Sequence, residues 1–168
     1  IEITRGDRRL FGNLSLALTP GTLLLVTGAN GSGKTSLLRA LCGLLLPSGG
    51  SGTVAGYDII RESERIKAHI GYMSQKFSLY EALTVDQNIS FFGAMYGLSD
   101  DRIAARRAFV LEMAGLAGRG HTKARDLAGG WRQRLALGCA ILHEPRIVFL
   151  DEPTGGVDPV SRRQFWRL

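Results

Sequence analysis

The sequence predicts an α/β domain in which a mostly parallel β-sheet core is interrupted by an inserted α-helical subdomain. Three observations predict this class. Two continuous apolar runs, at residues 23–26 and 147–150, are bounded by polar or turn-forming residues, as in strands buried on both faces of a parallel sheet. Helical patterns alternate with strand patterns along the chain. One long stretch, at about residues 84–143, contains helical patterns alone.

In the first half of the chain, strands and helices are expected to alternate. Leucines at every second position predict a half-buried strand at residues 14–18, which ends at the Pro20-Gly21 turn. After the apolar run at 23–26, leucines at helical spacing predict a helix that begins at Gly33 and ends before Pro47. Shorter patterns predict a strand at 53–55, a helix near 62–68 and a strand at 70–73.

The second half begins with helices at 84–97 and from Ser99, whose hydroxyl can cap the helix start. A loop at 118–128 precedes a helix that is expected to run from Gly129 or Gly130 to about Glu144. Its buried face is expected to contain three residues spaced i, i+4 and i+7, namely Leu135, Cys139 and Leu142. The strand at 147–150 follows, and a last helix is expected after Asp158-Pro159.

Composition excludes several classes of protein. The chain has 168 residues, 45% of them hydrophobic and 21% charged, which is typical of a globular protein and argues against disorder. The net charge of +6 comes from scattered arginines without interleaved aromatic residues, so we expect solvated helix faces and no nucleic-acid partner. Two cysteines, Cys42 and Cys139, are too few for a disulfide framework. They are expected to be small buried residues in a reducing compartment.

A phosphate-binding loop is the strongest motif. Residues 28–35 fit the pattern G-x-x-x-x-G-K-[ST] and lie between an apolar run and a helical pattern. Such a loop directs backbone N–H groups at phosphate, Lys34 adds a positive charge, and the Thr35 hydroxyl can bind Mg²⁺. A glycine-rich turn that merely caps a helix would explain the glycines but not the lysine. The candidate nucleotide-binding residues here are Gly28, Asn30, Gly31, Ser32, Gly33, Lys34, Thr35 and Ser36.

Two carboxylates follow the apolar run at 147–150. The carboxyl ends of parallel strands are where open α/β sheets place ligand chemistry. We therefore expect Asp151 to hold the metal ion, through water, and Glu152 to orient or polarise an attacking water. A strand that ends in two solvated acids is common, so the pair predicts this chemistry only in combination with the phosphate loop.

Five motifs in order resemble the nucleotide-binding subunit of ATP-binding cassette (ABC) transporters, over essentially the whole chain. Residues 28–35 match the Walker A loop, and residues 147–152 match Walker B with its catalytic glutamate. Gln75 lies where the Q-loop glutamine is expected. Residues 127–134, Leu-Ala-Gly-Gly-Trp-Arg-Gln-Arg, match the family signature, and residues 155–158 match the D-loop.

The resemblance implies a P-loop NTPase fold with an N-terminal antiparallel β portion, as one domain over residues 1–168. Its parts would be a core at 1–75, the Q-loop and helical subdomain at 76–143, and the Walker B and D-loop part at 144–168. The expected cofactors are ATP and Mg²⁺. Gln75 would be catalytic with Glu152, and it would bind the metal ion together with Thr35 and Asp151. Nucleotide binding in trans would use Ala128, Gly129 and Gly130.

The resemblance also implies partners and a location. Residues 72–80 and 151–159 look like those of ABC-2 type exporter ATPases, whereas residues 8–39 are reminiscent of the haem-exporter ATPase of cytochrome c maturation. Such subunits pair head to tail with a second nucleotide-binding subunit and bind transmembrane permease subunits at the cytoplasmic face of the bacterial inner membrane. Phe77, Leu79 and Tyr80 would contact the permease or pack locally.

Several positions depart from the family pattern. Ala128 replaces the signature serine, and Trp131 replaces the signature glutamine. Arg5 lies where the family often has an aromatic residue that stacks on adenine. The switch histidine of the family would lie beyond Leu168. The three histidines present are expected to be ordinary surface or helix-end residues: His69, His121 and His143.

Three functions remain open at this point. The chain resembles an ATP-hydrolysing subunit that powers a membrane exporter. A soluble cassette ATPase that acts on DNA or ribosomes is an alternative, although it would usually show an inserted coiled coil or a second cassette. A truncated or engineered fragment that binds nucleotide, or only folds, is another. On the sequence, we expect these 168 residues alone to have little ATPase activity.

Overall fold

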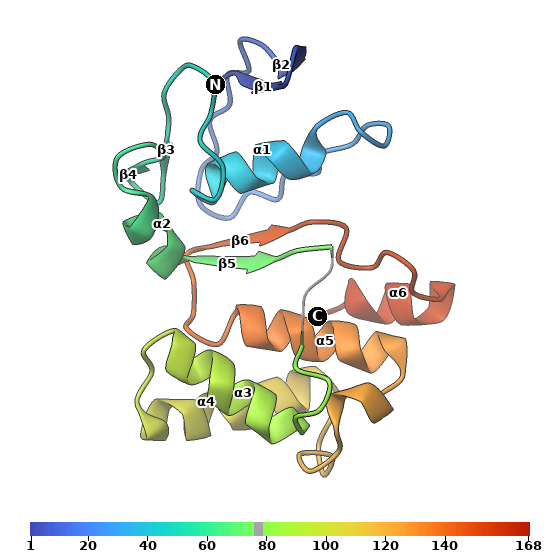
Figure 1. Cartoon of the computed structure of the whole chain (residues 1–168). Coiled ribbons are helices and arrows are strands. Elements are labelled where there is room, and N and C mark those ends of the chain that lie inside the picture. The colour runs from blue at the N-terminus through green and yellow to red at the C-terminus, as the bar shows by residue number, and fades with distance from the viewer. Residues whose placement is uncertain (76–78) are drawn as a thin grey trace. The chain divides into compact units, whose positions relative to one another are not determined.

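The structure, a computed structural model, describes residues 1–75 and 79–168. These residues form two compact units, Ile1–Ile70 and Gly71–Leu168, whose helices and strands are labelled in Figure 1. The mixture of helices and short sheets confirms the predicted α/β class. Among the described residues, each helix is too short or too polar to cross a lipid bilayer.

The first unit begins with an antiparallel hairpin of β1 (Ile3–Arg5) and β2 (Arg8–Phe11). Ile3 is 2% exposed and packs against buried residues of α1 (Lys34–Leu41), with Phe11 at the edge of the same cluster. The hairpin thereby fixes the start of α1 against a small apolar core. The antiparallel N-terminal portion that the family resemblance implied is present.

Helix α1 is shorter than predicted, because a glycine terminates it. Gly43 has a φ of 68°, in the left-handed region that a side chain disfavours. The Gly43 N–H donates to Ala40 O at 3.1 Å, and the Leu44 N–H donates to Arg39 O at 2.8 Å. This pair of hydrogen bonds is found at the C-terminal ends of many helices that a glycine terminates. The helix therefore stops at Leu41 and not just before Pro47.

The strands predicted at 14–18 and 23–26 are absent from the described structure. Leu16 and Leu18 are about half exposed, and Leu23 and Leu25 are 90% and 77% exposed. A strand needs neighbours that satisfy its backbone groups. Within this unit the described strands pair only as local hairpins, so these two apolar segments remain coil. The prediction that residues 23–26 form a strand buried on both faces is wrong for this structure.

A second hairpin joins β3 (Thr53–Val54) to β4 (Tyr57–Asp58), a strand that the sequence patterns did not predict. Both central residues of its turn have positive φ, 53° at Ala55 and 88° at Gly56, as a type I′ hairpin turn requires. Helix α2 (Ser63–His69) follows close to its predicted position.

The second unit contains the two-stranded sheet of β5 (Ile70–Met73) and β6 (Ile147–Leu150), and both strands match their predicted bounds. The arrows of β5 and β6 point the same way in Figure 1, so their carboxyl ends meet at one edge of the sheet. There the Asp151 N–H donates to Met73 O at 2.9 Å.

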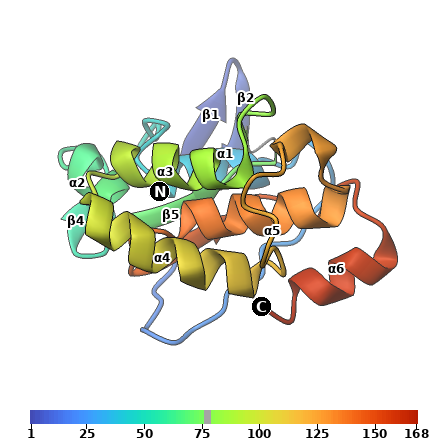
Figure 2. The same cartoon turned by 90° about the horizontal axis from the view of Figure 1, so that it is seen from below.

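Helices α3 (Val85–Met95), α4 (Asp100–Met113) and α5 (Gly129–Ala140) pack on one another, as Figures 1 and 2 both show. They are joined to a short 3₁₀ helix (Ala124–Asp126) and followed, after β6, by α6 (Pro159–Phe165). The predicted buried residues Leu135, Cys139 and Leu142 are fully buried, and this prediction is confirmed.

Both cysteines are buried, as predicted, and Cys139 lies in the core of this helical layer. Burial raises the pKa of the Cys139 thiol, so the group stays protonated and acts as a small apolar residue. Helix α5 ends at Ala140, four residues before its predicted end. The side chain of Arg106 instead binds the carbonyl groups of Ile141 and Leu142, and Glu144 adopts a left-handed φ of 56°.

Candidate functional site

The phosphate loop lies in the first unit, immediately before α1. Ser32 N donates to Ala29 O at 3.2 Å, which closes a turn, and Gly31 within it has a φ of 76°. Gly33 is the N-cap residue of α1 with a φ of 102°. Lys34, Thr35 and Ser36 follow as the first residues of the helix and are half-buried. The predicted loop and helix are therefore present in this order, whereas the strand predicted before them is not.

Two loop glycines are required by their surroundings. A Cβ atom at Gly33 would lie 2.6 Å from Phe11 Cε2 and 3.2 Å from Leu10 Cβ. A Cβ atom at Gly28 would lie 2.8 Å from Ser32 Oγ. The hairpin residues Leu10 and Phe11 therefore press directly on the start of α1. The loop can follow this path only where side chains are absent.

The Lys34 ammonium group folds back over the loop. Its Nζ atom donates to Gly28 O at 2.8 Å and to Ala29 O at 3.1 Å. Among the described residues no side chain caps α1, and its first turn contains no acidic residue. The backbone N–H groups and the partial positive charge of the helix start therefore share one end of α1 with the lysine. Such an end attracts phosphate groups.

The carboxylates lie in the second unit, at the carboxyl ends of β5 and β6. Asp151 is 3% exposed, whereas Glu152 is exposed and has a left-handed φ of 50°. The Gln75 Nε2 atom donates to Glu152 Oε2 at 2.9 Å. The structure therefore brings Gln75, Asp151 and Glu152 together, although the sequence patterns predicted each of them separately and not their contact.

These side chains suit a hard cation. Gln75 uses its amide nitrogen on Glu152, which leaves an amide oxygen as its remaining terminal atom. With the Asp151 carboxylate, the donors that this unit offers to a metal ion are oxygen atoms, the ligands that Mg²⁺ prefers. Groups of three or more His, Cys, Asp or Glu side chains that could hold a different metal ion are absent from the described residues.

The signature residues form the start of α5. Ala128 is the N-cap residue, and in the described chain it makes no side-chain cap hydrogen bond, consistent with the loss of the usual hydroxyl. Gly129 and Gly130 occupy the first turn. Trp131 packs against the helical core, and the guanidinium carbon of Arg119 lies 4.2 Å from its ring centroid. This tryptophan therefore serves the core and the covering arginine at a position where the family has a polar side chain.

The D-loop residues lead into α6, as predicted. Asp158 caps the helix, and its Oδ1 atom accepts hydrogen bonds from Val160 N and Ser161 N, both at 3.0 Å. A hydrogen bond from the Ser161 side chain, with those from the two N–H groups, lowers the pKa of Asp158 below its ordinary value. The sequence patterns predicted this helix start but missed Ser161, because no spacing indicates where α6 meets α5.

The remaining expectations concern single residues. His69 is the last residue of α2, His121 is exposed, and the His143 ring stacks on Tyr96 at 3.9 Å between centroids. The Tyr80 ring lies 4.5 Å from that of Phe91, which is the local packing considered above. Phe77 lies outside the described residues.

Comparisons with known proteins agree with these motifs. A family model described as "ABC transporter" matches residues 11–155. The chain is 42% identical to the probable multidrug ABC transporter ATP-binding protein YbhF of Escherichia coli K12, over 98% of the chain and 29% of that protein. It is 40% identical to the daunorubicin resistance ATP-binding protein DrrA3 of Streptomyces coeruleorubidus, over 96% of the chain and 51% of that protein.

A solved structure titled "Structure of ATP binding subunit of ABC transporter" superposes with a TM-score of 0.83 at 24% identity. It covers 99% of the chain and 69% of the solved protein, and at this identity it supports the fold. The chain thus spans less than a third of one of the two curated relatives named above and about half of the other.

Proposed function

This chain belongs to the ABC transporter family, and on that premise we propose that it is an ATP-binding and ATP-hydrolysing part of a membrane exporter. The observation that carries the proposal is the phosphate loop, with an uncapped helix start and a lysine held over it. ATP would bind through residues 28–36, with the backbone N–H groups on the phosphates and the Lys34 charge on the β- and γ-oxygens.

The hydrolytic step would use the carboxylate cluster. The Glu152 carboxylate accepts a proton from a water molecule as the water oxygen attacks the γ-phosphorus, and ADP leaves with the electrons of the broken phosphorus–oxygen bond. Gln75 fixes the Glu152 side chain through the 2.9 Å hydrogen bond. Bound Mg²⁺, held by Thr35, Gln75 and Asp151, would neutralise charge on the phosphate oxygens.

Partners and location follow from the family. Ala128, Gly129 and Gly130 would contact the nucleotide of a second nucleotide-binding subunit in a head-to-tail dimer, with N–H groups at the start of α5 facing its phosphates. The dimer would bind transmembrane permease subunits at the cytoplasmic face of a bacterial inner membrane. The names of YbhF and DrrA3, which refer to multiple drugs and to daunorubicin resistance, favour drugs as the exported compounds.

The test compares Glu152→Gln with the parent sequence, both in a completed cassette. We expect the variant to retain ATP with Mg²⁺ and to release phosphate more slowly by about a hundredfold or more, because a positioned general base typically contributes that much. Glu112→Gln, at an exposed position on α4, is the matched control and should hydrolyse ATP at the parent rate. Equal turnover of Glu152→Gln and the parent would remove Glu152 from the mechanism.

A further inference from the structure

Helix α6 lies alongside the first turns of α5, and Figures 1 and 2 show the two helices side by side. One face of α6 makes the contact. Ser161, Gln164 and Phe165 recur at i, i+3 and i+4, which places them on the same side of the helix. The opposite helix begins with Gly129 and Gly130.

The closest approach occurs at Gly130. A Cβ atom at this position would lie 2.6 Å from Ser161 Oγ and 2.7 Å from Ser161 Cβ, closer than non-bonded atoms can approach. A Cβ atom at the neighbouring Gly129 would meet no atom of the described residues within 4 Å. The two adjacent glycines therefore differ. Helix α6 can pack this closely only because Gly130 has no side chain, whereas a side chain at Gly129 would not touch α6.

Helix α6 cannot simply retreat from an added side chain, because it is held further along. Phe165 is 4% exposed and packs with Met73, Ala136 and Ala140. The Arg134 guanidinium group of α5 donates to Gln164 Oε1. With this end of α6 fixed, an atom added at Gly130 would displace the other end, which carries Ser161.

The Ser161 end of α6 is also the end that holds the D-loop. Both the N–H group and the side chain of Ser161 bind the Asp158 carboxylate. A displacement of Ser161 would therefore move the Asp158 side chain and, with it, the D-loop at residues 155–158. The signature glycine and the D-loop aspartate are thus connected through one serine.

We propose that Gly130 and Ser161 are positioning residues that set the D-loop aspartate, Asp158, relative to the start of the signature helix α5. Gly130 permits the approach, and Ser161 transmits it to the carboxylate. The effect on turnover rests on the proposed function, whereas the contact itself does not. Gly130, the second signature glycine, thus positions the D-loop of its own subunit in addition to leaving room for a phosphate of the nucleotide.

The first test follows the Asp158 carboxyl group by NMR titration of the whole chain. In Gly130→Ala the pKa of Asp158 should rise toward its ordinary value, because the displaced Ser161 no longer donates to it. In Gly129→Ala the titration should be that of the parent. Ser161→Ala, which removes only the hydroxyl group, should also raise this pKa. An Asp158 titration that is unchanged in Gly130→Ala would overturn the proposal.

The second test asks whether removing the serine side chain relieves the clash. Gly130→Ala should shift the amide resonances of Val160 and Ser161 when it is introduced into the parent. It should also shift them when it is introduced into Ser161→Ala, because alanine keeps the Cβ atom that causes the clash. In Ser161→Gly it should shift them little, and this double variant should fold even if Gly130→Ala alone does not. Equal shifts in the Ser161→Gly and Ser161→Ala backgrounds would contradict the proposal.

Turnover supplies a third readout. Gly130→Ala should lower phosphate release by about tenfold to a hundredfold, as small misplacements of reacting groups do, with a smaller loss in the Ser161→Gly background. These rates are measured in a completed cassette; if that cassette with the parent sequence neither binds nor hydrolyses ATP, the proposed function fails while the two NMR tests still decide the positioning role. If turnover is lost equally in both backgrounds, Gly130 acts on the nucleotide alone and the positioning role is rejected.

Discussion

Asn88 shows how much one buried polar side chain can organise. It is fully buried on α3, and its Oδ1 atom accepts from Tyr80 N at 2.9 Å. Its Nδ2 atom lies within hydrogen-bonding distance of three backbone oxygens, those of Tyr80, Leu83 and Thr84. These bonds, together with the Leu83 N–H that donates to Tyr80 O at 3.0 Å, hold the segment that leads into α3. Buried amides are stable only when they are satisfied in this way.

Replacing Asn88 should therefore be costly. In Asn88→Ala the Tyr80 N–H loses its side-chain acceptor and three backbone oxygens each lose one donor, and we expect the free energy of unfolding to fall by about 2–4 kcal/mol. Urea denaturation measures this value. Ser90→Ala, at an exposed position of the same helix, is the control and should stay within about 0.5 kcal/mol of the parent. A similar small effect of Asn88→Ala would show that water replaces the amide.

Glu152 illustrates a different constraint at the residue scale. Its φ of 50° is unusual for a residue with a side chain, and it occurs where the chain leaves β6. The conformation turns the chain so that Gly155 N donates to Glu152 O at 2.9 Å, while the side chain stays beside Gln75. Non-glycine residues in this region are often found at functional sites. The geometry therefore agrees with the catalytic role proposed for Glu152.

At the scale of elements, two helices end in the same way but in different surroundings. Gly43 ends α1 and Gly97 ends α3, with φ values of 68° and 73°. A Cβ atom at Gly97 would meet no described atom within 4 Å. A Cβ atom at Gly43 would lie 2.8 Å from Ser63 Cβ and 3.1 Å from Ser63 Cα, which belongs to the backbone.

This difference yields a paired prediction. Gly97→Ala should lower the free energy of unfolding by about 1–2 kcal/mol, the cost of a side chain in the left-handed region. Gly43→Ala should lower the free energy of unfolding by at least about 1 kcal/mol more than Gly97→Ala does. The reason is that the contact with Ser63 adds overpacking to the backbone strain. Denaturant titration of both variants tests the order. Equal costs would mean that α2, which carries Ser63, yields without penalty.

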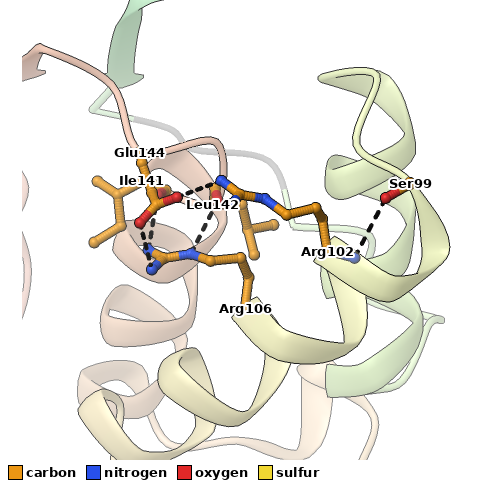
Figure 3. Close-up of polar contacts among 6 residues, drawn as sticks. All are labelled: Ser99, Arg102, Arg106, Ile141, Leu142 and Glu144. Carbon is orange, nitrogen blue, oxygen red and sulfur yellow. Dashed lines mark hydrogen bonds and ion pairs between the residues drawn. The ribbon is translucent and has the colours of Figure 1, made fainter.

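Helix α4 is joined to the end of α5 by two arginines that share one carboxylate, as Figure 3 shows. Arg106 donates to Glu144 and to the carbonyl oxygens of Ile141 and Leu142, and its side chain is 17% exposed. Among the described residues, the Arg102 side chain binds only Glu144, and it is 58% exposed. Arg106 thus occupies the carbonyl groups at the end of α5, next to the turn into β6.

The two arginines should therefore differ in their effects. Arg106→Met should lower the free energy of unfolding by about 1–3 kcal/mol, since the carbonyl groups of Ile141 and Leu142 lose the guanidinium donor. Arg102→Met should change it by less than about 1 kcal/mol, as exposed ion pairs do. Thermal or urea unfolding of both variants decides the matter. If Arg102→Met costs as much as Arg106→Met, the carboxylate and not the carbonyl groups accounts for the stabilisation.

At the scale of the whole molecule, features that depend on neighbouring residues could be predicted from the sequence, whereas contacts between residues far apart in the chain could not. Neighbouring residues predict the cap of α4 at Ser99, the start of α6 after Asp158 and the buried face of α5. The strands at 14–18 and 23–26 were wrong, because an apolar run becomes a strand only where other strands flank it. The contact of Gly130 with Ser161 joins two helices that sequence patterns treat separately.

The candidate site follows the same division. The phosphate loop and the carboxylate pair could be predicted because each is a contiguous motif beside an apolar run. The bond between Gln75 and Glu152 could not, since it depends on the pairing of β5 with β6. The roles of these residues remain predictions, and the variants Lys34→Ala and Glu152→Gln test two of them.

The central claim is that residues 28–35 bind Mg²⁺–ATP through the Lys34 charge and the start of α1. Isothermal titration calorimetry of the parent and Lys34→Ala tests it most directly, with Lys67→Ala on α2 as a control that removes an equal charge elsewhere. We predict tight binding by the parent and Lys67→Ala, and a loss of at least about tenfold in Lys34→Ala, since a charge-assisted contact contributes about 1.5–3 kcal/mol. Equal affinity of Lys34→Ala and the parent for Mg²⁺–ATP would contradict the account.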